Sequence, residues 1–315
     1  MMLGYILKRL LHAVPVALAV SVICFSLVQL APGDPLAVVL PADASQETVD
    51  AVKAQYGLDR PLVVQYFIWL GNVVTGDFGK SIATGRPVLS EISNAIGYSL
   101  SLAFLASLMA LIVGLSLGML AGYTIGSPVD KVASAFAISG VSIPHYWLGI
   151  VLVVIFSVQL NALPAMGAGT NPDAGILERL RFMILPAVTL AAMPAGIVTR
   201  SVRALVAETL ARDFVTALRA KGLTEVQIFW HVVKNSAPTA LAVIGVQMGY
   251  LMAGSILVET VFSWPGTGLL LNSAILTRDI PLLQGTILVL ALFFVAMNLI
   301  VDILQPLFDP RIKRI

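Results

Sequence analysis

Long apolar runs separated by shorter polar segments dominate this chain. A helix needs about 20 apolar residues to cross the hydrocarbon core of a membrane. A run such as 100–121 shows none of the alternation expected for a strand of an outer-membrane barrel. The pattern therefore predicts an all-α polytopic membrane protein, a single transmembrane domain over residues 1–315 with about six spans. These spans are 10–30, 98–123, 132–160, 182–199, 238–262 and 282–305.

The first run and the prolines need separate consideration. Lys8 and Arg9 precede the first run, as in a secretory signal, but the apolar core of a signal covers only roughly 7–15 residues. This run is longer, so we expect an uncleaved first transmembrane helix. Pro144 is expected to bend the third span. The short fourth span contains Pro186 and Pro194.

Composition supports a membrane protein. The chain is 58% hydrophobic and 11% charged, and its mean hydropathy is +0.93. Soluble domains carry about 25% charged residues. The formal net charge of +2 does not suggest nucleic-acid binding. The single cysteine, Cys24, cannot form an internal disulfide and lies within an apolar span.

Cationic residues predict the orientation. Six spans place both termini on one side, and lysine and arginine concentrate on the cytoplasmic side. The loops on the side of the termini are short and rich in these residues, whereas segment 31–97 is long and rich in acidic residues. Both termini and loop 200–235 are therefore expected to be cytoplasmic, and segment 31–97 extracytoplasmic. The cationic residues of the first set are Lys8, Arg9, Lys131, Arg200, Arg203, Arg212, Arg219, Lys221, Lys234, Arg311, Lys313 and Arg314.

Segment 31–97 is expected to contain two amphipathic helices. Residues 45–56 have a helical pattern that ends at Gly57, and the aromatic stretch 61–74 ends at Gly76. Aromatic side chains favour the membrane–water boundary. The second helix either lies at this boundary for structural reasons or forms a docking surface for an external partner. The sequence leaves both readings open.

Loop 200–235 is predicted to contain a helix, a glycine corner and a second helix. Asp213 is a suitable N-cap, and Gly222 stands where a helix ends in the left-handed conformation. Thr224 and Gln227 have the spacing of a capping box. The loop could merely join two spans. Its many apolar residues instead favour a soluble partner that they pack against.

The sequence around Gly222 resembles a conserved loop of known importers. Thr216-Ala-Leu-Arg-Ala-Lys-Gly222 is similar to the Glu-Ala-Ala-x-x-x-Gly loop of permeases that work with ATP-binding-cassette (ABC) ATPases. Its departures from that form look like the dipeptide, oligopeptide and nickel branch, and the long segment after the first span looks like the B-type subunit. Further matching motifs occur in order along the chain: Ala31-Pro-Gly-Asp-Pro35, Tyr56-Gly-Leu-Asp-Arg-Pro-Leu62, Gly76-Asp-Phe-Gly-Lys-Ser81, Ser142-Ile-Pro-His-Tyr-Trp147, Glu259-Thr-Val-Phe-Ser-Trp-Pro-Gly266, Arg278-Asp-Ile-Pro-Leu-Leu-Gln-Gly285 and Asp309-Pro-Arg311.

The resemblance implies a type I ABC importer permease fold in a bacterial inner membrane. The helix near Asp213 would be the coupling helix, seated on a cytoplasmic ATPase. The implied partners are a second homologous permease subunit, two cytoplasmic ATP-binding subunits and an extracytoplasmic solute-binding protein. The permease would form half of the translocation path for short peptides or a related solute. The expected coupling residues are Asp213, Phe214, Thr216, Ala217, Leu218, Arg219, Ala220, Lys221, Gly222 and Leu223.

The chain itself is expected to bind no cofactor and to catalyse no reaction. Gly79-Lys-Ser81 is like the end of a P-loop, but Val74 stands where that loop needs its first glycine. ATP and magnesium are thus expected in the partner subunits. His12, His145 and His231 have no metal-ligand spacing. We identify no catalytic residue.

Two sets of residues within the spans have candidate roles. Gly114, Gly118 and Gly122 lie on one face of the second span, where small residues allow close helix packing. A role in the substrate path is the alternative. Pro144 and His145, where a span should bend, and Glu259, near the outer end of the fifth span, are candidates for the translocation path.

An ion-coupled secondary transporter is the main alternative function, and a membrane-embedded enzyme is a weaker one. Such a transporter would be expected to carry several ionisable groups near the membrane midplane. The chain has Glu259 and Asp302, both expected near an interface. The sequence does not identify the transported solute.

Overall fold

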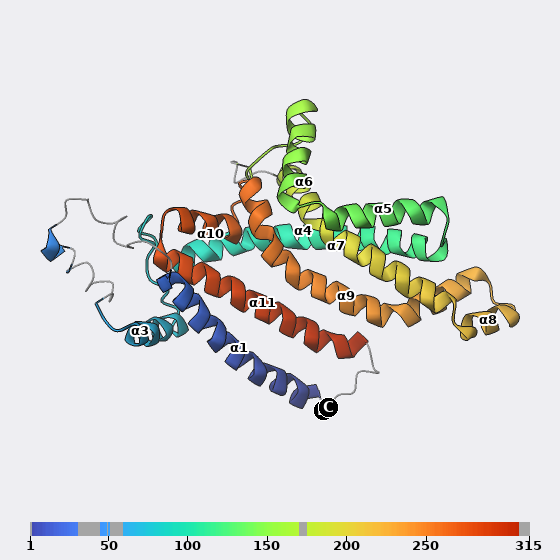
Figure 1. The fold of residues 1–315 in the computed structure, drawn as a ribbon, viewed down its shortest axis with the longest axis horizontal. Coiled ribbons are helices and arrows are strands. Elements are labelled where there is room, and N and C mark those ends of the chain that lie inside the picture. The colour runs from blue at the N-terminus through green and yellow to red at the C-terminus, as the bar shows by residue number, and fades with distance from the viewer. Residues whose placement is uncertain (1, 31–44, 49, 51–58, 170–174, 309–315) are drawn as a thin grey trace.

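The computed structural model describes residues 2–30, 45–48, 50, 59–169 and 175–308. The described part is helical, apart from turns and one isolated bridge between Lys80 and Pro87, which confirms the prediction of an all-α fold. Most of the long helices run along the long axis of the molecule (Figure 1). The helices are α1 Met2–Leu30, α3 Leu62–Val74, α4 Val88–Tyr123, α5 Pro128–Ser142, α6 His145–Leu152, η2 Val153–Gln159, α7 Ile176–Leu210, α8 Asp213–Ala220, α9 Glu225–Val261, α10 Thr267–Leu276 and α11 Ile280–Phe308.

Three described helices are long and apolar enough to cross a membrane: α4, α7 and the 280–297 part of α11. The number rises to five if two bent pairs, α5 with α6–η2 and the two parts of α9, each count as one span. In α1 the apolar stretch Leu11–Ser26 is shorter than these. The sixth span, over residues 10–30, therefore stays a prediction.

The predicted bend at Pro144 is a sharp corner. The axes of α5 and of α6–η2 differ by 107°. Ile143 has extended backbone angles, φ −82° and ψ 124°, because the residue before a proline is disfavoured in the helical conformation. The predicted continuous span over 132–160 is thus two helices, and α6 stands away from the long axis of the molecule (Figure 1).

Helix α7 is longer than the predicted fourth span. It covers 35 residues, with Pro186 and Pro194 inside, against the predicted 182–199. The charged residues that suggested the end of the span, such as Arg200, continue the same helix. Most of the predicted 200–235 loop is likewise helical, since α7 ends at Leu210 and α9 begins at Glu225.

Helices α4 and α7 pack closely through the three glycines of α4. A Cβ atom on Gly114 would lie 2.8 Å from Val198 Cβ, and one on Gly122 would lie 2.7 Å from Val206 Cβ. A Cβ atom on Gly118 would lie 2.8 Å from the carbonyl oxygen of Thr199. The two backbones approach at distances that only glycine permits on this face.

The end of the bundle that carries α10 is joined by a buried carboxylate. Asp279 accepts hydrogen bonds from Ser81 Oγ (2.5 Å) and Ala83 N (3.1 Å), and also from Leu282 N (3.1 Å) in the first turn of α11. Asp279 is fully buried. The turn that follows the Gly76–Ser81 motif is thereby tied to the start of the last helix. Helix α10 itself was not anticipated from the sequence.

Of the two helices expected in segment 31–97, the second is present as α3. It ends before Gly76, whose φ is +88°, and packs on α1 through Tyr66, which lies 2.9 Å from Ser21 Oγ (hydroxyl to hydroxyl) and stacks edge-on against Phe25. Residues 46–48 and 50 are helical, but most of the predicted helix 45–56 lies outside the described residues.

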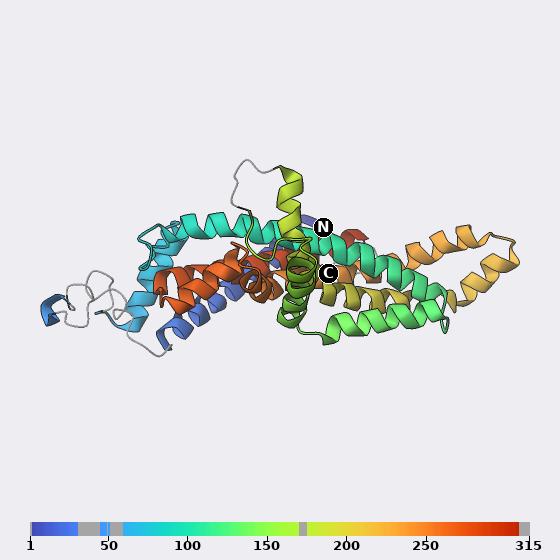
Figure 2. The same ribbon diagram turned by 90° about the horizontal axis from the view of Figure 1, so that it is seen from above.

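Helix α8 and the first turns of α9 project beyond the other helices at one end of the bundle (Figure 2). The start of α1 and the end of α11 lie toward this same end (Figure 1). Helices α3 and α10 lie at the opposite end.

Candidate functional site

The projecting hairpin of α8 and α9 begins at a two-residue corner after α7. Arg212, with φ −75° and ψ 145°, is the N-cap of α8, and no side chain caps this end. The prediction that Asp213 is the N-cap is therefore wrong by one residue. Asp213 is exposed in the first helical turn. Its charge still interacts favourably with the positive end of the helix dipole there.

The second corner of the hairpin is fixed by hydrogen bonds at both sides. Gly222 has φ +82°, and its N–H donates to Arg219 O at 2.9 Å, while Leu223 N donates to Leu218 O at 3.2 Å. This pair of bonds is a Schellman motif, which needs a left-handed residue at Gly222. The predicted Thr224–Gln227 capping box is confirmed. The corner between α8 and α9 is thus a defined turn.

An ion pair bridges this corner. Arg219 Nε lies 3.0 Å from Glu225 Oε1, with both side chains at least half exposed. The hydrogen bond to Glu225 raises the pKa of Arg219, which is already fully protonated at neutral pH. Solvent screens exposed pairs of this kind strongly. The pair therefore helps to orient the two helices and adds little stability.

Most apolar residues of the hairpin pack within the chain. Val215 and Ile228 are fully buried, and the half-buried Phe214, Leu218 and Leu223 pack around the same cluster, against valines of α7. The expectation that these apolar residues need a partner to cover them is therefore wrong for most of them. In the first two turns of α9, Val226 (67%) and Trp230 (58%) remain exposed.

The outward face of α8 is made of small or charged side chains. Thr216, Ala217 and Ala220 are exposed, and side chains of this size allow another backbone to approach closely. The ten expected coupling residues divide between this face and the packed side. The exposed ones are Asp213, Thr216, Ala217, Arg219, Ala220, Lys221 and Gly222, and the half-buried ones are Phe214, Leu218 and Leu223.

The three candidate path residues have different environments. Pro144 is exposed at the corner, and the half-buried His145 has its Nδ1 3.5 Å from Thr189 O. Glu259 is fully buried where α4, α9 and α10 meet, and it accepts hydrogen bonds from Ser99 Oγ at 2.7 Å and Gly268 N at 2.6 Å. Hydroxyl and amide donors thus satisfy the Glu259 carboxylate inside the bundle.

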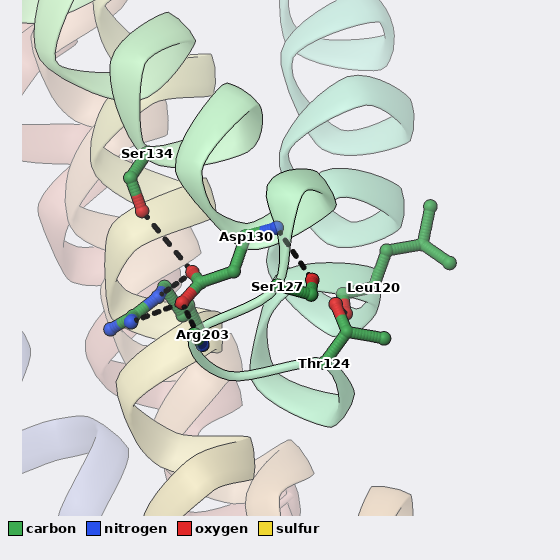
Figure 3. Close-up of polar contacts among 7 residues, drawn as sticks. Leu120, Thr124, Ser127, Asp130, Ser134 and Arg203 are labelled. Atoms are coloured by element: carbon green, nitrogen blue, oxygen red, sulfur yellow. Dashed lines mark hydrogen bonds and ion pairs between the residues drawn. The ribbon is translucent and has the colours of Figure 1, made fainter.

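Two functional candidates were missed from the sequence. Asp130, at the start of α5, forms an ion pair with Arg203 of α7 (Figure 3). Ser127 accepts a hydrogen bond from Asp130 N at 3.2 Å as the N-cap of α5, and the Ser-Pro-x-Asp sequence is a helix-start signal that could have marked Asp130. Nothing in the sequence indicates its pairing with Arg203, 73 residues away.

Comparison with known proteins identifies the family. Residues 114–314 match the family described as binding-protein-dependent transport system inner membrane component, and residues 2–103 match the N-terminal family of the same systems. A peptide transport system permease protein of Brucella melitensis biotype 1 is 39% identical over 314 residues, covering 99% of each chain. The glutathione transport system permease protein GsiC of Escherichia coli strain K12 is 36% identical over 313 residues, again 99% of each chain.

These matches extend over nearly the whole chain and confirm the resemblance that the ordered motifs indicated. They favour neither an ion-coupled transporter nor an enzyme. The apolar helices agree with a protein that crosses the inner membrane several times. The chain belongs to the family of binding-protein-dependent transport system inner membrane components and is a permease subunit of an ABC importer, not an enzyme.

Proposed function

We propose that the outward face of α8 is the surface through which this permease couples to a cytoplasmic ATPase. The observation that carries the proposal is the construction of the hairpin. Helix α8 projects from the bundle, its large apolar side chains pack inward, and Thr216, Ala217 and Ala220 face out. A rigid helix with small outward side chains can lie in a groove of another protein, because the backbones of the two proteins can then approach each other closely.

The partners proposed for this subunit follow from its family. A second homologous permease completes the translocation path, two ATP-binding subunits attach from the cytoplasm, and a solute-binding protein delivers the solute from outside. ATP and magnesium belong to the ATP-binding subunits. Among the described residues, no group of three or more metal-binding side chains occurs that could hold an ion.

The proposed orientation places both termini in the cytoplasm with α8. The start of α1, the end of α11 and the α8 hairpin lie toward one end of the bundle (Figure 1), and the sequence concentrates lysine and arginine there. Segment 31–97, including α3, then faces the outside, where the solute-binding protein docks.

The solute proposed for this importer is a short peptide or a similar molecule such as glutathione. The support lies in the names of the relatives, one a peptide permease and one a glutathione permease, which match this chain over its length. Selection among such solutes is assigned to the solute-binding protein.

A photocrosslinking experiment tests the coupling surface. Benzoylphenylalanine is placed at Ala217 in the assembled complex, with Val63 on α3, which is 68% exposed at the opposite end of the bundle, as the matched control. We expect Ala217 to crosslink to the ATPase and Val63 not to. An intact complex in which Ala217 reaches no ATPase would contradict the proposal.

A further inference from the structure

An ion pair fastens the start of α5 to the half of α7 nearest the α8 hairpin. Arg203 Nη2 donates to Asp130 Oδ2 at 2.8 Å, and Arg203 Nε donates to Asp130 Oδ1 (Figure 3). Both carboxylate oxygens are therefore held by one guanidinium. This two-bond geometry fixes direction as well as distance, which a lysine could not do.

The carboxylate of Asp130 is also part of the corner between α4 and α5. Gly126 N donates to Asp130 Oδ2 at 2.9 Å, and Ser134 Oγ donates to Oδ1 at 3.3 Å. The Asp130 side chain is 6% exposed and that of Arg203 is 32% exposed, whereas the side chains of the Arg212–Glu208 pair at the end of α7 are 51% and 65% exposed. The partly buried Asp130–Arg203 pair is therefore screened less by salt than the surface pair.

Helix α5 touches α7 closely at a second place. A Cβ atom on Gly140 would lie 2.5 Å from Ala192 O, and one on Gly196 would lie 2.5 Å from Ala137 O. The helices are thus in backbone contact near the end of α5, and the ion pair joins them near its start. Just beyond this contact the chain turns through 107° at Pro144.

Helix α7 is continuous from this contact to the hairpin. Arg203 lies seven residues before Leu210, the last residue of α7, and the α8 helix starts at Asp213. Helix α4 meets the same level of α7, because a Cβ atom on Gly122 would lie 3.0 Å from Arg203 O. The three helices α4, α5 and α7 are therefore joined near Arg203. A displacement of α8 would pass through this region of α7 before it reached the membrane-spanning helices.

We propose that the Asp130–Arg203 pair is a positioning contact in transport, which makes α5 follow α7. A displacement of α8 by an ATPase then reaches the corner at Pro144 through α5. Without the pair, α7 moves while the start of α5 lags behind. This inference rests on the proposed coupling function of α8.

The test measures distances between spin labels in the complete complex with its partner subunits, in lipid nanodiscs. One label pair, at Val132 and Ala204, reports on α5 against α7, and a second, at Ala204 and Tyr146, spans the corner at Pro144. All three side chains are exposed. Each pair is measured without nucleotide and after trapping with magnesium, ATP and vanadate, in a chain with Cys24→Ser.

In the parent we expect a constant distance for the first pair and a shift on trapping for the second. With Asp130→Asn or Arg203→Gln, the first distance should become dependent on the nucleotide state and the shift of the second should be reduced. Arg203→Lys, which keeps the charge but not the two-bond geometry, should restore part of the parental behaviour. Glu208→Gln, which breaks the exposed pair on the same helix, should behave as the parent.

Parental distances in both states for Asp130→Asn and Arg203→Gln would overturn the inference. If the pair only stabilises the fold, these variants would lower the yield of the complex, but the assembled fraction would keep the parental distances. That outcome would also overturn the inference. If Asp130→Asn does not assemble, Arg203→Lys and Arg203→Gln carry the test. Failure of the coupling function itself would appear differently, as a parent in which trapping shifts neither pair and Ala217 does not crosslink.

Discussion

At the scale of single residues, the backbone angle of Gly222 sets the direction of the chain at the corner between α8 and α9. A Cβ atom on Gly222 would meet no atom within 4 Å, so the space is open. The requirement lies in φ +82°, which an L-residue adopts at a cost of roughly 1–2 kcal/mol. The glycine is needed for the direction of the chain and not for close packing.

We therefore expect Gly222→Val to insert into the membrane normally and to abolish transport, because a β-branched residue disfavours the left-handed turn and alters the angle between α8 and α9. Uptake and the amount of membrane-inserted protein are measured side by side. Gly222→Asn is the control, since asparagine tolerates this conformation. Full uptake by Gly222→Val at normal expression would refute the role given to this corner.

Among single residues, those in local turns were predictable from the sequence, whereas contacts between distant residues were not. Gly222, Thr224 and Gln227 were predictable because caps and turns depend on neighbours in the chain. The surroundings of Glu259 and the partner of Asp130 were not, since each involves a residue more than 70 positions away. Such contacts depend on how the helices pack, which local patterns do not encode.

At the scale of helices, apolar length predicted where helices lie better than where they end. The predicted fifth span began at residue 238, yet α9 begins at Glu225, and α4 begins at Val88 and not at 98. Charge marks where a helix leaves the membrane, but the backbone hydrogen bonds continue into water. Proline was equally ambiguous, because Pro144 ends a helix whereas Pro186 and Pro194 lie within one.

The contact between α4 and α7 gives a prediction with a control on the same helix. Gly118→Ala introduces a Cβ atom 2.8 Å from Thr199 O, a backbone atom that cannot move aside cheaply. Overpacking of this kind costs about 1–3 kcal/mol. We expect a lower thermal unfolding midpoint for the purified chain, measured by the reaction of a thiol-specific dye with the buried Cys24.

Gly97→Ala is the matched control for this measurement. Gly97 lies in α4 with no atom near its Cβ position, so alanine should be neutral or should stabilise the helix by up to about 1 kcal/mol. Equal midpoints for the two variants would show that the glycine face is not closely packed.

At the scale of the whole molecule, the two ends of the bundle differ in construction. One end carries the projecting α8 hairpin, whose corner is held by local caps and an exposed ion pair. Behind the hairpin the buried Asp130 carboxylate joins α5 to α7, and at the opposite end the buried carboxylates Glu259 and Asp279 link segments far apart in the sequence. This arrangement suits a protein that receives a displacement at the hairpin while buried polar contacts keep its helices together.

The orientation of the bundle is testable with a membrane-impermeant maleimide and the Cys24→Ser chain. We expect Ala217→Cys to react in inside-out vesicles and not in intact spheroplasts, because α8 is proposed to face the cytoplasm. Val63→Cys on α3 should show the opposite pattern. Reaction of Ala217→Cys from outside would reverse the orientation and remove the basis for an ATPase contact.

The inward packing of Phe214, Val215 and Leu218 has a consequence for assembly of the importer. Since the chain already covers these side chains, the hairpin is folded before another subunit arrives. Docking then orders no loose segment and avoids the entropy that such ordering costs. In a newly made permease the α8–α9 hairpin therefore already has its final shape. Binding of another subunit then brings together two surfaces that are both preformed.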